Sequence, residues 1–192
     1  MPTRSTPFRV LQWCACLLLL CVAPSASTAE EAPALAVDLH DGPYVFLAED
    51  GSTTVKWVAA GRAQTKRFGP GAAIKLPQFA HLLGKAWKPT PHEVPPAVWP
   101  QPEKLLIVSD VEGNYDALLR FLIANGVVDE KGCWSFGKGH LVGLGDMVDR
   151  GEQVTETLWL FHRLTREAQA AGGHVHFILG NHEAMVLGND LR

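Results

Sequence analysis

The stretch that decides the fold is HLVGLGDMVDRG, residues 140–151. From His140 to Leu144 the residues are mostly apolar, which predicts a short buried strand. Residues 145–151 that follow are rich in glycine and charge, as expected for a loop. A buried strand that runs directly into an acidic loop places ionisable side chains at the end of the strand, where ligands bind in open α/β sheets.

Two further apolar runs flank this strand, and each also ends in a polar loop. Residues 105–108 run into an acidic loop at 109–113, and residues 174–179 run into Gly-Asn-His-Glu at 180–183. Apolar residues recur at helical spacing between the strands, at 115–123 and at 154–168. Strand, helix, strand, helix, strand in one region predicts an α/β fold with a parallel βαβαβ sheet.

Acidic and amide side chains therefore follow all three predicted strands. The carboxyl ends of parallel strands lie at one edge of the sheet, so we expect the three loops to meet there. Carboxylates that are packed together repel one another unless a cation is bound between them. Oxygen-rich groups with occasional imidazole suit hard divalent cations better than thiophilic metals.

These loops resemble the signature of the calcineurin-like metallophosphoesterases, which reads D-x-H-G, G-D-x-x-D-R-G and G-N-H-E. The second and third blocks match letter for letter at residues 145–151 and 180–183. The surrounding sequence is most similar to the Shewanella-like branch of phosphoprotein phosphatases. The resemblance implies the N-terminal half of an αββα sandwich.

Carried over to this chain, the resemblance implies two divalent metal ions. Asp110 and Glu112 would hold the first ion, Asp146 would bridge the two, and Asn181 would hold the second. Mn is the favoured metal, with Fe, Zn and Mg as alternatives. The family normally has histidine where Glu112 stands, so Glu112 is either a metal ligand or a mark of lost activity.

The resemblance also implies the catalytic residues His182, Asp149 and Arg150. Arg150 and Asn181 would bind phosphate, His182 would protonate the leaving oxygen, and Asp149 would fix the tautomer of His182. The implied enzyme is a metallophosphoesterase that hydrolyses phosphomonoesters, phosphoproteins among them, with a hydroxide activated by both metals. Glu183 either assists this site or serves the electrostatics of a helix N-terminus.

The sequence before residue 103 predicts three further segments. Residues 1–29 read as a signal peptide, with Arg4 and Arg9 beside the apolar run 10–22. Residues 30–88 predict a small β-rich module built on a β-meander, and the prolines of residues 89–102 predict an extended linker. We expect the phosphoesterase domain, 103–192, to be truncated at its C-terminus, because family members continue with further strands and two more histidines.

The signal peptide implies export to a bacterial periplasm or secretion, with no stable membrane span after its removal. Three of the four cysteines would leave with it, so Cys133 has no partner for a disulfide. Trp159 lies off the main apolar stripe of its predicted helix, and we expect it to contact a part of the domain outside this chain.

Composition limits the partners. With 47% hydrophobic and 19% charged residues, the chain is not of the disordered class, and a formal charge of −3 favours no nucleic-acid partner. The expected partner is a phosphate ester or a phosphoprotein. Two alternatives stay open, namely a non-catalytic or degenerate envelope binding protein on the same scaffold, and a nucleotide-tetraphosphate hydrolase.

Overall fold

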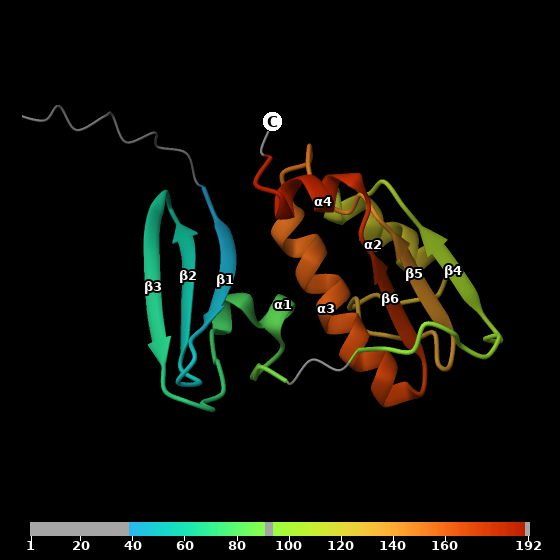
Figure 1. The fold of residues 1–192 in the computed structure, drawn as a ribbon, viewed down its shortest axis with the longest axis horizontal. Helices are drawn as coiled ribbons and strands as arrows, with labels where there is room; N and C mark the ends of the chain where they lie inside the picture. Colours follow the sequence, from blue (N-terminus) through green and yellow to red (C-terminus); the bar gives the residue numbers. More distant parts are fainter. Residues whose placement is uncertain (1–38, 91–93, 191–192) are drawn as a thin grey trace, which may run out of the picture. The chain divides into compact units, whose positions relative to one another are not determined.

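A computed structural model describes residues 39–90 and 94–190 of the chain. It contains an antiparallel sheet of three strands followed by a parallel sheet of three strands with helices (Figure 1). The predicted α/β class and βαβαβ order are therefore confirmed. The predicted signal peptide and the first residues of the β-rich module lie outside the described residues.

The antiparallel sheet is the predicted β-meander. Its strands are β1 (Asp41–Leu47), β2 (Thr53–Ala59) and β3 (Arg62–Phe68), which are hydrogen-bonded in that order. Gly51 adopts a positive φ of 77° in the turn between β1 and β2. That conformation suits glycine because it has no Cβ, so the Asp-Gly signal correctly marks this turn.

One face of the meander packs on a small apolar core. The chain leaves β3, forms the 3-10 turn η1 (Pro77–Phe79) and then the one-turn helix α1 (Ala80–Leu83). These elements cover the sheet with side chains that are almost inaccessible to water. The buried members of this core are Val55, Ile74, Leu76, Leu83 and Trp87.

The parallel sheet has the order β4 (Leu105–Val108), β5 (His140–Leu144) and β6 (His174–Ile178). All three strands run in the same direction, so their carboxyl ends share one edge. The strand predictions at residues 105–108 and 140–144 match in full, and β6 ends one residue before the predicted end.

Three helices follow the parallel strands. They are α2 (Tyr115–Ala124), α3 (Val154–Ala171) and α4 (Asn181–Leu187). The Asn114 side chain accepts a hydrogen bond from the Ala117 N–H and so caps α2. The helices α2 and α3 bury their apolar stripes against one face of the sheet in a core that includes Leu118, Leu122, Leu141, Leu160, Phe161 and Leu164.

The other face of the parallel sheet is largely open. Alternation along the strands sends every second side chain to this face. Four apolar residues there are about half exposed: Leu105 (53%), Ile107 (52%), Leu144 (53%) and Ile178 (46%). This face therefore presents a sizeable apolar surface in the described part of the chain.

Helix α3 contacts the meander as well as the parallel sheet. The Trp159 indole N–H donates to the Pro43 carbonyl at 2.9 Å, and its ring meets Trp87 edge to face at 5.7 Å. Trp159 therefore packs against the meander and the segment that follows it, a set of contacts that the sequence analysis did not predict. Its partners lie more than seventy positions away in the sequence, where helical periodicity carries no information.

Trp99, in the proline-rich segment, packs on three histidines at the start of the parallel strands. Its ring centre lies 3.9 Å from that of His174, 5.2 Å from His176 and 5.7 Å from His140. His140 Nδ1 and His176 Nε2 are 3.0 Å apart, a hydrogen-bond distance at which the tautomers of the two rings decide which nitrogen donates. The predicted linker is thus attached to the sheet at Trp99.

Candidate active site

Backbone hydrogen bonds join the loops at the carboxyl edge of the parallel sheet. The Asp110 N–H donates to the Gly145 carbonyl at 3.2 Å, and the Glu112 N–H donates to the Asp146 carbonyl at 3.0 Å. The third loop joins through a side chain, because the His182 N–H donates to Asp146 Oδ1 at 3.0 Å. The three loops that the sequence singled out therefore meet at one place.

The backbone of these loops is strained at the predicted site residues. In the described part of the chain seven non-glycine residues have a positive φ, and five of them are Asp110 (54°), Glu112 (49°), Asp146 (54°), Asp149 (87°) and Arg150 (54°). Each left-handed conformation at a residue with a Cβ costs about 1–3 kcal/mol and persists where the surroundings enforce it. Strain of this kind clusters at functional sites, which supports a functional reading of these loops.

Glycines let the loops approach one another. A Cβ on Gly151 would collide with the Glu112 carbonyl, and a Cβ on Gly113 would lie 3.0 Å from the Gly151 carbonyl. A Cβ on Gly180 would collide with Asp146 Oδ1. Close backbone approach is thus the physical reason for glycine in each of the three blocks.

Asp149 and His182 form a hydrogen-bonded side-chain pair in the site. His182 Nδ1 lies 2.8 Å from Asp149 Oδ2, and the Arg150 N–H donates to Asp149 Oδ1 at 2.8 Å. These two hydrogen bonds, the Arg150 N–H first, lower the pKa of the Asp149 carboxyl below its ordinary value. Asp149 is therefore held as a carboxylate that orients the imidazole of His182.

Arg150 and Glu112 form an ion pair across two loops. Arg150 Nη1 lies 2.8 Å from Glu112 Oε1. The Arg150 side chain is 66% exposed, whereas that of Glu112 is 23% exposed. The guanidinium is therefore open to an incoming anion, and the carboxylate predicted as a metal ligand has the guanidinium as its partner.

The residues predicted as metal ligands have the right donor chemistry. In residues 39–90 and 94–190, no three His, Cys, Asp or Glu side chains form a group that could hold a metal ion. The side chains of Asp110 and Asn181 make no hydrogen bond or ion pair with the described residues, so their oxygens are available at the joined loops. Carboxylate and amide oxygens suit hard divalent cations such as Mn and Mg.

Glu183 is a second residue of this region, after Glu112, whose role the sequence left undecided. Its side chain is buried, with 5% of the residue exposed, and its carboxylate accepts from four backbone N–H groups. Burial raises the pKa of the Glu183 carboxyl, but those donors together bring it below its ordinary value. The signal in the sequence is an acid three residues after Gly180, the spacing at which an acid caps a helix N-terminus.

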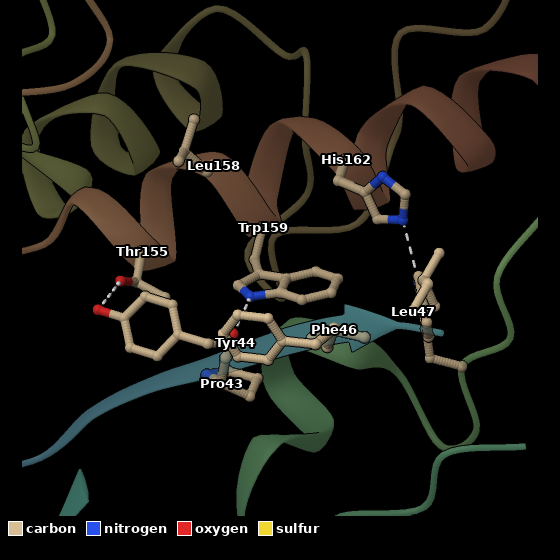
Figure 2. A pocket seen from close by; sticks show the side chains of 10 residues that line it. Pro43, Tyr44, Phe46, Leu47, Thr155, Leu158, Trp159 and His162 are labelled. Carbon is tan, nitrogen blue, oxygen red and sulfur yellow. Dashed lines mark hydrogen bonds between the residues drawn. The ribbon is translucent and has the colours of Figure 1, made fainter. Parts of the chain in front are cut away.

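A separate apolar pocket lies between β1 and α3 (Figure 2). Its volume is about 420 Å³. The Tyr44, Phe46 and Trp159 rings and the Leu158 side chain line it, and Thr155 hydrogen-bonds the Tyr44 hydroxyl at one end (Figure 2). No residue of the three signature blocks lines this pocket.

Across the part of the chain that the structure describes, we find no helix with the length and apolar character that a bilayer crossing demands. Cys133 is exposed and free.

Sequence comparison gives a family for the second half of the chain. Residues 103–191 match the model of the calcineurin-like phosphoesterase family. Over 92 residues the chain is 33% identical to Shewanella-like protein phosphatase 2 of Arabidopsis thaliana, which covers 48% of this chain and 24% of that protein. An uncharacterized protein of Schizosaccharomyces pombe is 36% identical over 93 residues, covering 47% of this chain and 28% of that protein.

Structural comparison extends the likeness further toward the N-terminus. The cold-active protein tyrosine phosphatase of a psychrophilic Shewanella species matches with a TM-score of 0.71 at 38% identity, over 80% of this chain and 46% of that chain. A point mutant of a cold-active protein tyrosine phosphatase gives a TM-score of 0.72 at 39% identity. Residues 103–191 are less than half of the chain, so this match includes residues before the phosphoesterase segment.

The chain spans about half the length of these solved structures and about a quarter of the curated relatives. The joined loops, their strained backbone and their signature blocks all lie in the segment that the family model matches. Residues 103–191 therefore belong to a calcineurin-like phosphoesterase domain, and their homologues include a Shewanella-like protein phosphatase and a cold-active protein tyrosine phosphatase of Shewanella.

Proposed function

We propose that the site hydrolyses phosphomonoesters of the phosphoprotein class with the help of two divalent metal ions. The family of the segment 103–191 typically uses two metal ions. The observation that carries the proposal is the pairing of His182 Nδ1 with Asp149 Oδ2 at 2.8 Å, beside the exposed guanidinium of Arg150. An oriented imidazole and a solvent-exposed guanidinium are what phosphate-ester cleavage needs from side chains.

The metal ions would be held by oxygen donors of the joined loops: Asp110, Glu112, Asp146 and Asn181. Bound there, they would act as Lewis acids and lower the pKa of a water molecule. The side chains of Asp110 and Asn181 support this assignment because they have no partner among the described residues and lie on loops that Asp146 joins.

The protein side chains would bind the phosphate and move a proton. Arg150 would bind phosphate oxygens with its planar fork of N–H donors, with Asn181 as a second phosphate-binding residue. Asp149 would accept a hydrogen bond from the Nδ1–H of His182. The other ring nitrogen of the protonated imidazole, Nε2, would then donate its proton to the leaving oxygen. The site would thus bind the dianion and protonate its leaving group from different loops.

The class of substrate is inferred from the relatives. One is named a protein phosphatase, and the solved structures are titled protein tyrosine phosphatases. We therefore propose phosphotyrosyl side chains as the first substrates to examine.

The test is hydrolysis of an aryl phosphate and of a phosphotyrosyl peptide in the presence of Mn²⁺. We expect Asp146→Asn to lower kcat/KM by about 10²-fold or more, since a bridging ligand loses its charge. Glu130→Gln, which removes an exposed charge outside the three blocks, is the matched control. Activity that survives in Asp146→Asn would overturn the two-metal mechanism.

A second candidate is a binding protein without turnover. It is favoured by the ion pair between Arg150 and Glu112, which engages both a predicted phosphate-binding residue and a predicted metal ligand. This candidate predicts that the chain binds inorganic phosphate or vanadate but releases no phosphate from either ester. Glu112→His, which restores the residue usual in the family, would then raise turnover from zero.

We also propose that the chain is exported, on the strength of residues 1–29 alone. Fusion of these residues to a reporter enzyme that is active only outside the cytoplasm tests export. The expected result is reporter activity that is lost when the apolar run 10–22 is interrupted by charges.

A further inference from the structure

Four backbone N–H groups converge on the carboxylate of Glu183. Oε2 accepts from Gly180 and Asp146, both at 2.8 Å, and Oε1 accepts from Met147 at 2.7 Å and from Val148 at 3.1 Å. The residue is 5% exposed. Water therefore has almost no access to these hydrogen bonds.

Three of the donors are consecutive in the chain. Residues 146–148 point their N–H groups to one side, which creates a concave site for an anion. Asp146, the first of them, has a φ of 54°, so the arrangement requires a strained backbone. A carboxylate fits because both of its oxygens only accept hydrogen bonds, whereas an amide of the same shape would present donors to donors.

The link between the two loops is reciprocal. Asp146 gives its N–H to Glu183, and the Asp146 carboxylate in turn accepts the His182 N–H at 3.0 Å. The Glu183 side chain of α4 thereby holds the backbone of the loop after β5. The Asp146 side chain of that loop in turn holds the backbone of α4 at His182. The backbone that carries the Asp146 carboxylate is thus held by Glu183, a buried residue of α4.

We propose that Glu183 is a positioning residue that acts through Asp146. It fixes the backbone of residues 146–148, and this in turn holds the Asp146 carboxylate and the His182 imidazole in one relative position. The consequence for the metal ions rests on the proposed function, whereas the structural link does not. Both carboxylate oxygens of Glu183 are engaged by backbone N–H groups, so in this proposal Glu183 binds neither substrate nor metal.

The first test follows single amides of the full chain by hydrogen exchange in NMR spectra. We expect Glu183→Gln to speed exchange about tenfold at its four donors and also at His182, which does not donate to Glu183. The control is Glu167→Gln, since Glu167 also accepts a loop N–H, that of Trp134 at 2.8 Å, far from the site in sequence. Unchanged exchange at His182 in Glu183→Gln would overturn the proposal.

The second test measures how Mn²⁺ activates hydrolysis of an aryl phosphate. A purely structural loss would lower the fraction of active protein at every Mn²⁺ concentration. The positioning role instead predicts that Glu183→Gln raises the Mn²⁺ concentration for half activation by about 10- to 100-fold, with KM unchanged and kcat recovered at saturating Mn²⁺. Glu167→Gln should leave the half-activation concentration unchanged.

The two tests separate the two proposals. A wild-type chain that neither binds Mn²⁺ nor turns over refutes the proposed function, while amide exchange still decides the link from Glu183 to His182. If Glu183→Gln does not fold, exchange in the wild-type chain at low denaturant concentrations takes its place. The amides of residues 146–148, 180 and 182 should then open with one common free energy, and independent opening of His182 would overturn the link.

Discussion

Side chains of the candidate site act in pairs, and each pair joins two loops. Asp149 holds the imidazole of His182, and Glu112 holds the guanidinium of Arg150. Both pairs include a residue with a left-handed backbone, so the direction of each side chain depends on a costly local conformation. Single substitutions in these pairs should therefore change activity more than stability.

Asp149→Asn should leave the fold intact and lower kcat. An amide oxygen accepts the Nδ1 proton more weakly than a carboxylate and does not stabilise the imidazolium, so His182 becomes a poorer acid. We expect a loss of about 10²-fold in kcat with an alkyl phosphate, whose alkoxide leaving group needs the proton, and a smaller loss with an aryl phosphate, whose phenolate leaves more readily without it. An equal loss for both esters would contradict the assigned role.

Gly180→Ala should disturb Asp146. The new Cβ would collide with Asp146 Oδ1 and would lie 2.7 Å from the Asp146 N atom, so the loop must shift. We expect Mn²⁺ to activate the variant about tenfold less well, with folding retained as judged by circular dichroism. Gly69→Ala is the control, because a Cβ there meets nothing within 4 Å.

For single residues, the sequence predicts which side chains pair only where both belong to a recognised motif. The Gly-Asp and Asn-His blocks correctly brought Asp149 and His182 to one loop cluster. The pairing of Glu112 with Arg150 could not be predicted, because it depends on left-handed backbone at both residues and not on their spacing. Glu183 was visible as an acid at a helix start, but its three donors in the β5 loop follow only from the fold.

Among the elements, α3 has the most varied surroundings. Its residues Phe161, Leu164 and Ala168 are buried against the parallel sheet, as helical periodicity predicts, whereas Leu158 of the same predicted stripe is 39% exposed. Its other side carries Trp159, which packs against the meander core. Periodicity identifies one apolar face of a helix, so a second face that meets a distant module stays hidden in the sequence.

Leu164→Ala should destabilise the chain strongly. Leu164 is fully buried in the main core, so the substitution removes apolar contacts and leaves a cavity. We expect a loss of about 2–5 kcal/mol in the free energy of unfolding, measured with urea. Leu158→Ala on the same helix should cost less than about 1 kcal/mol, since Leu158 is 39% exposed.

The histidines of β6 should make stability depend on pH. Burial, and after it the neighbouring His140, lower the pKa of His174 and His176 below the ordinary value of 6.5. The unfolded chain therefore binds more protons below pH 6.5, so stability is highest above this pH and falls as the pH decreases through it.

We expect the urea midpoint, followed by tryptophan fluorescence, to be lower at pH 5.5 than at pH 7.5 by an amount on the order of a few tenths of a molar. The double variant His174→Gln, His176→Gln should reduce this difference, while exposed His81→Gln should not. A difference that persists in the double variant would assign the pH dependence to other groups.

For the whole molecule, the half-exposed face of the parallel sheet should determine how strongly the chain self-associates in solution. Leu105, Ile107, Leu144 and Ile178 place exposed apolar area on one face of the sheet, and exposed apolar patches promote association. The sequence predicted the strands, but the continuous apolar run at residues 105–108 favoured a strand buried on both faces. The open face could not be predicted because an apolar run does not reveal what lies opposite.

The chain should therefore self-associate as its concentration rises. Ile107→Lys introduces a charge in the middle of the apolar face and should shift sedimentation velocity profiles toward the monomer. Glu130→Lys makes the same kind of change on an exposed polar position and should have no such effect. Equal sedimentation velocity profiles for wild type and Ile107→Lys would show that this face does not mediate self-association.

The hydrogen bond from Trp159 to the Pro43 carbonyl bears on where a shortened form of the chain should start. A shortened polypeptide that starts at residue 103 would agree with the family boundary. It would also remove the residues that pack on α3. The Trp159 indole would then be exposed to solvent, and its N–H would lose the Pro43 carbonyl as acceptor. A shortened chain for crystals or spectra should accordingly start before Asp41, so that α3 keeps its contacts with both the meander and the parallel sheet.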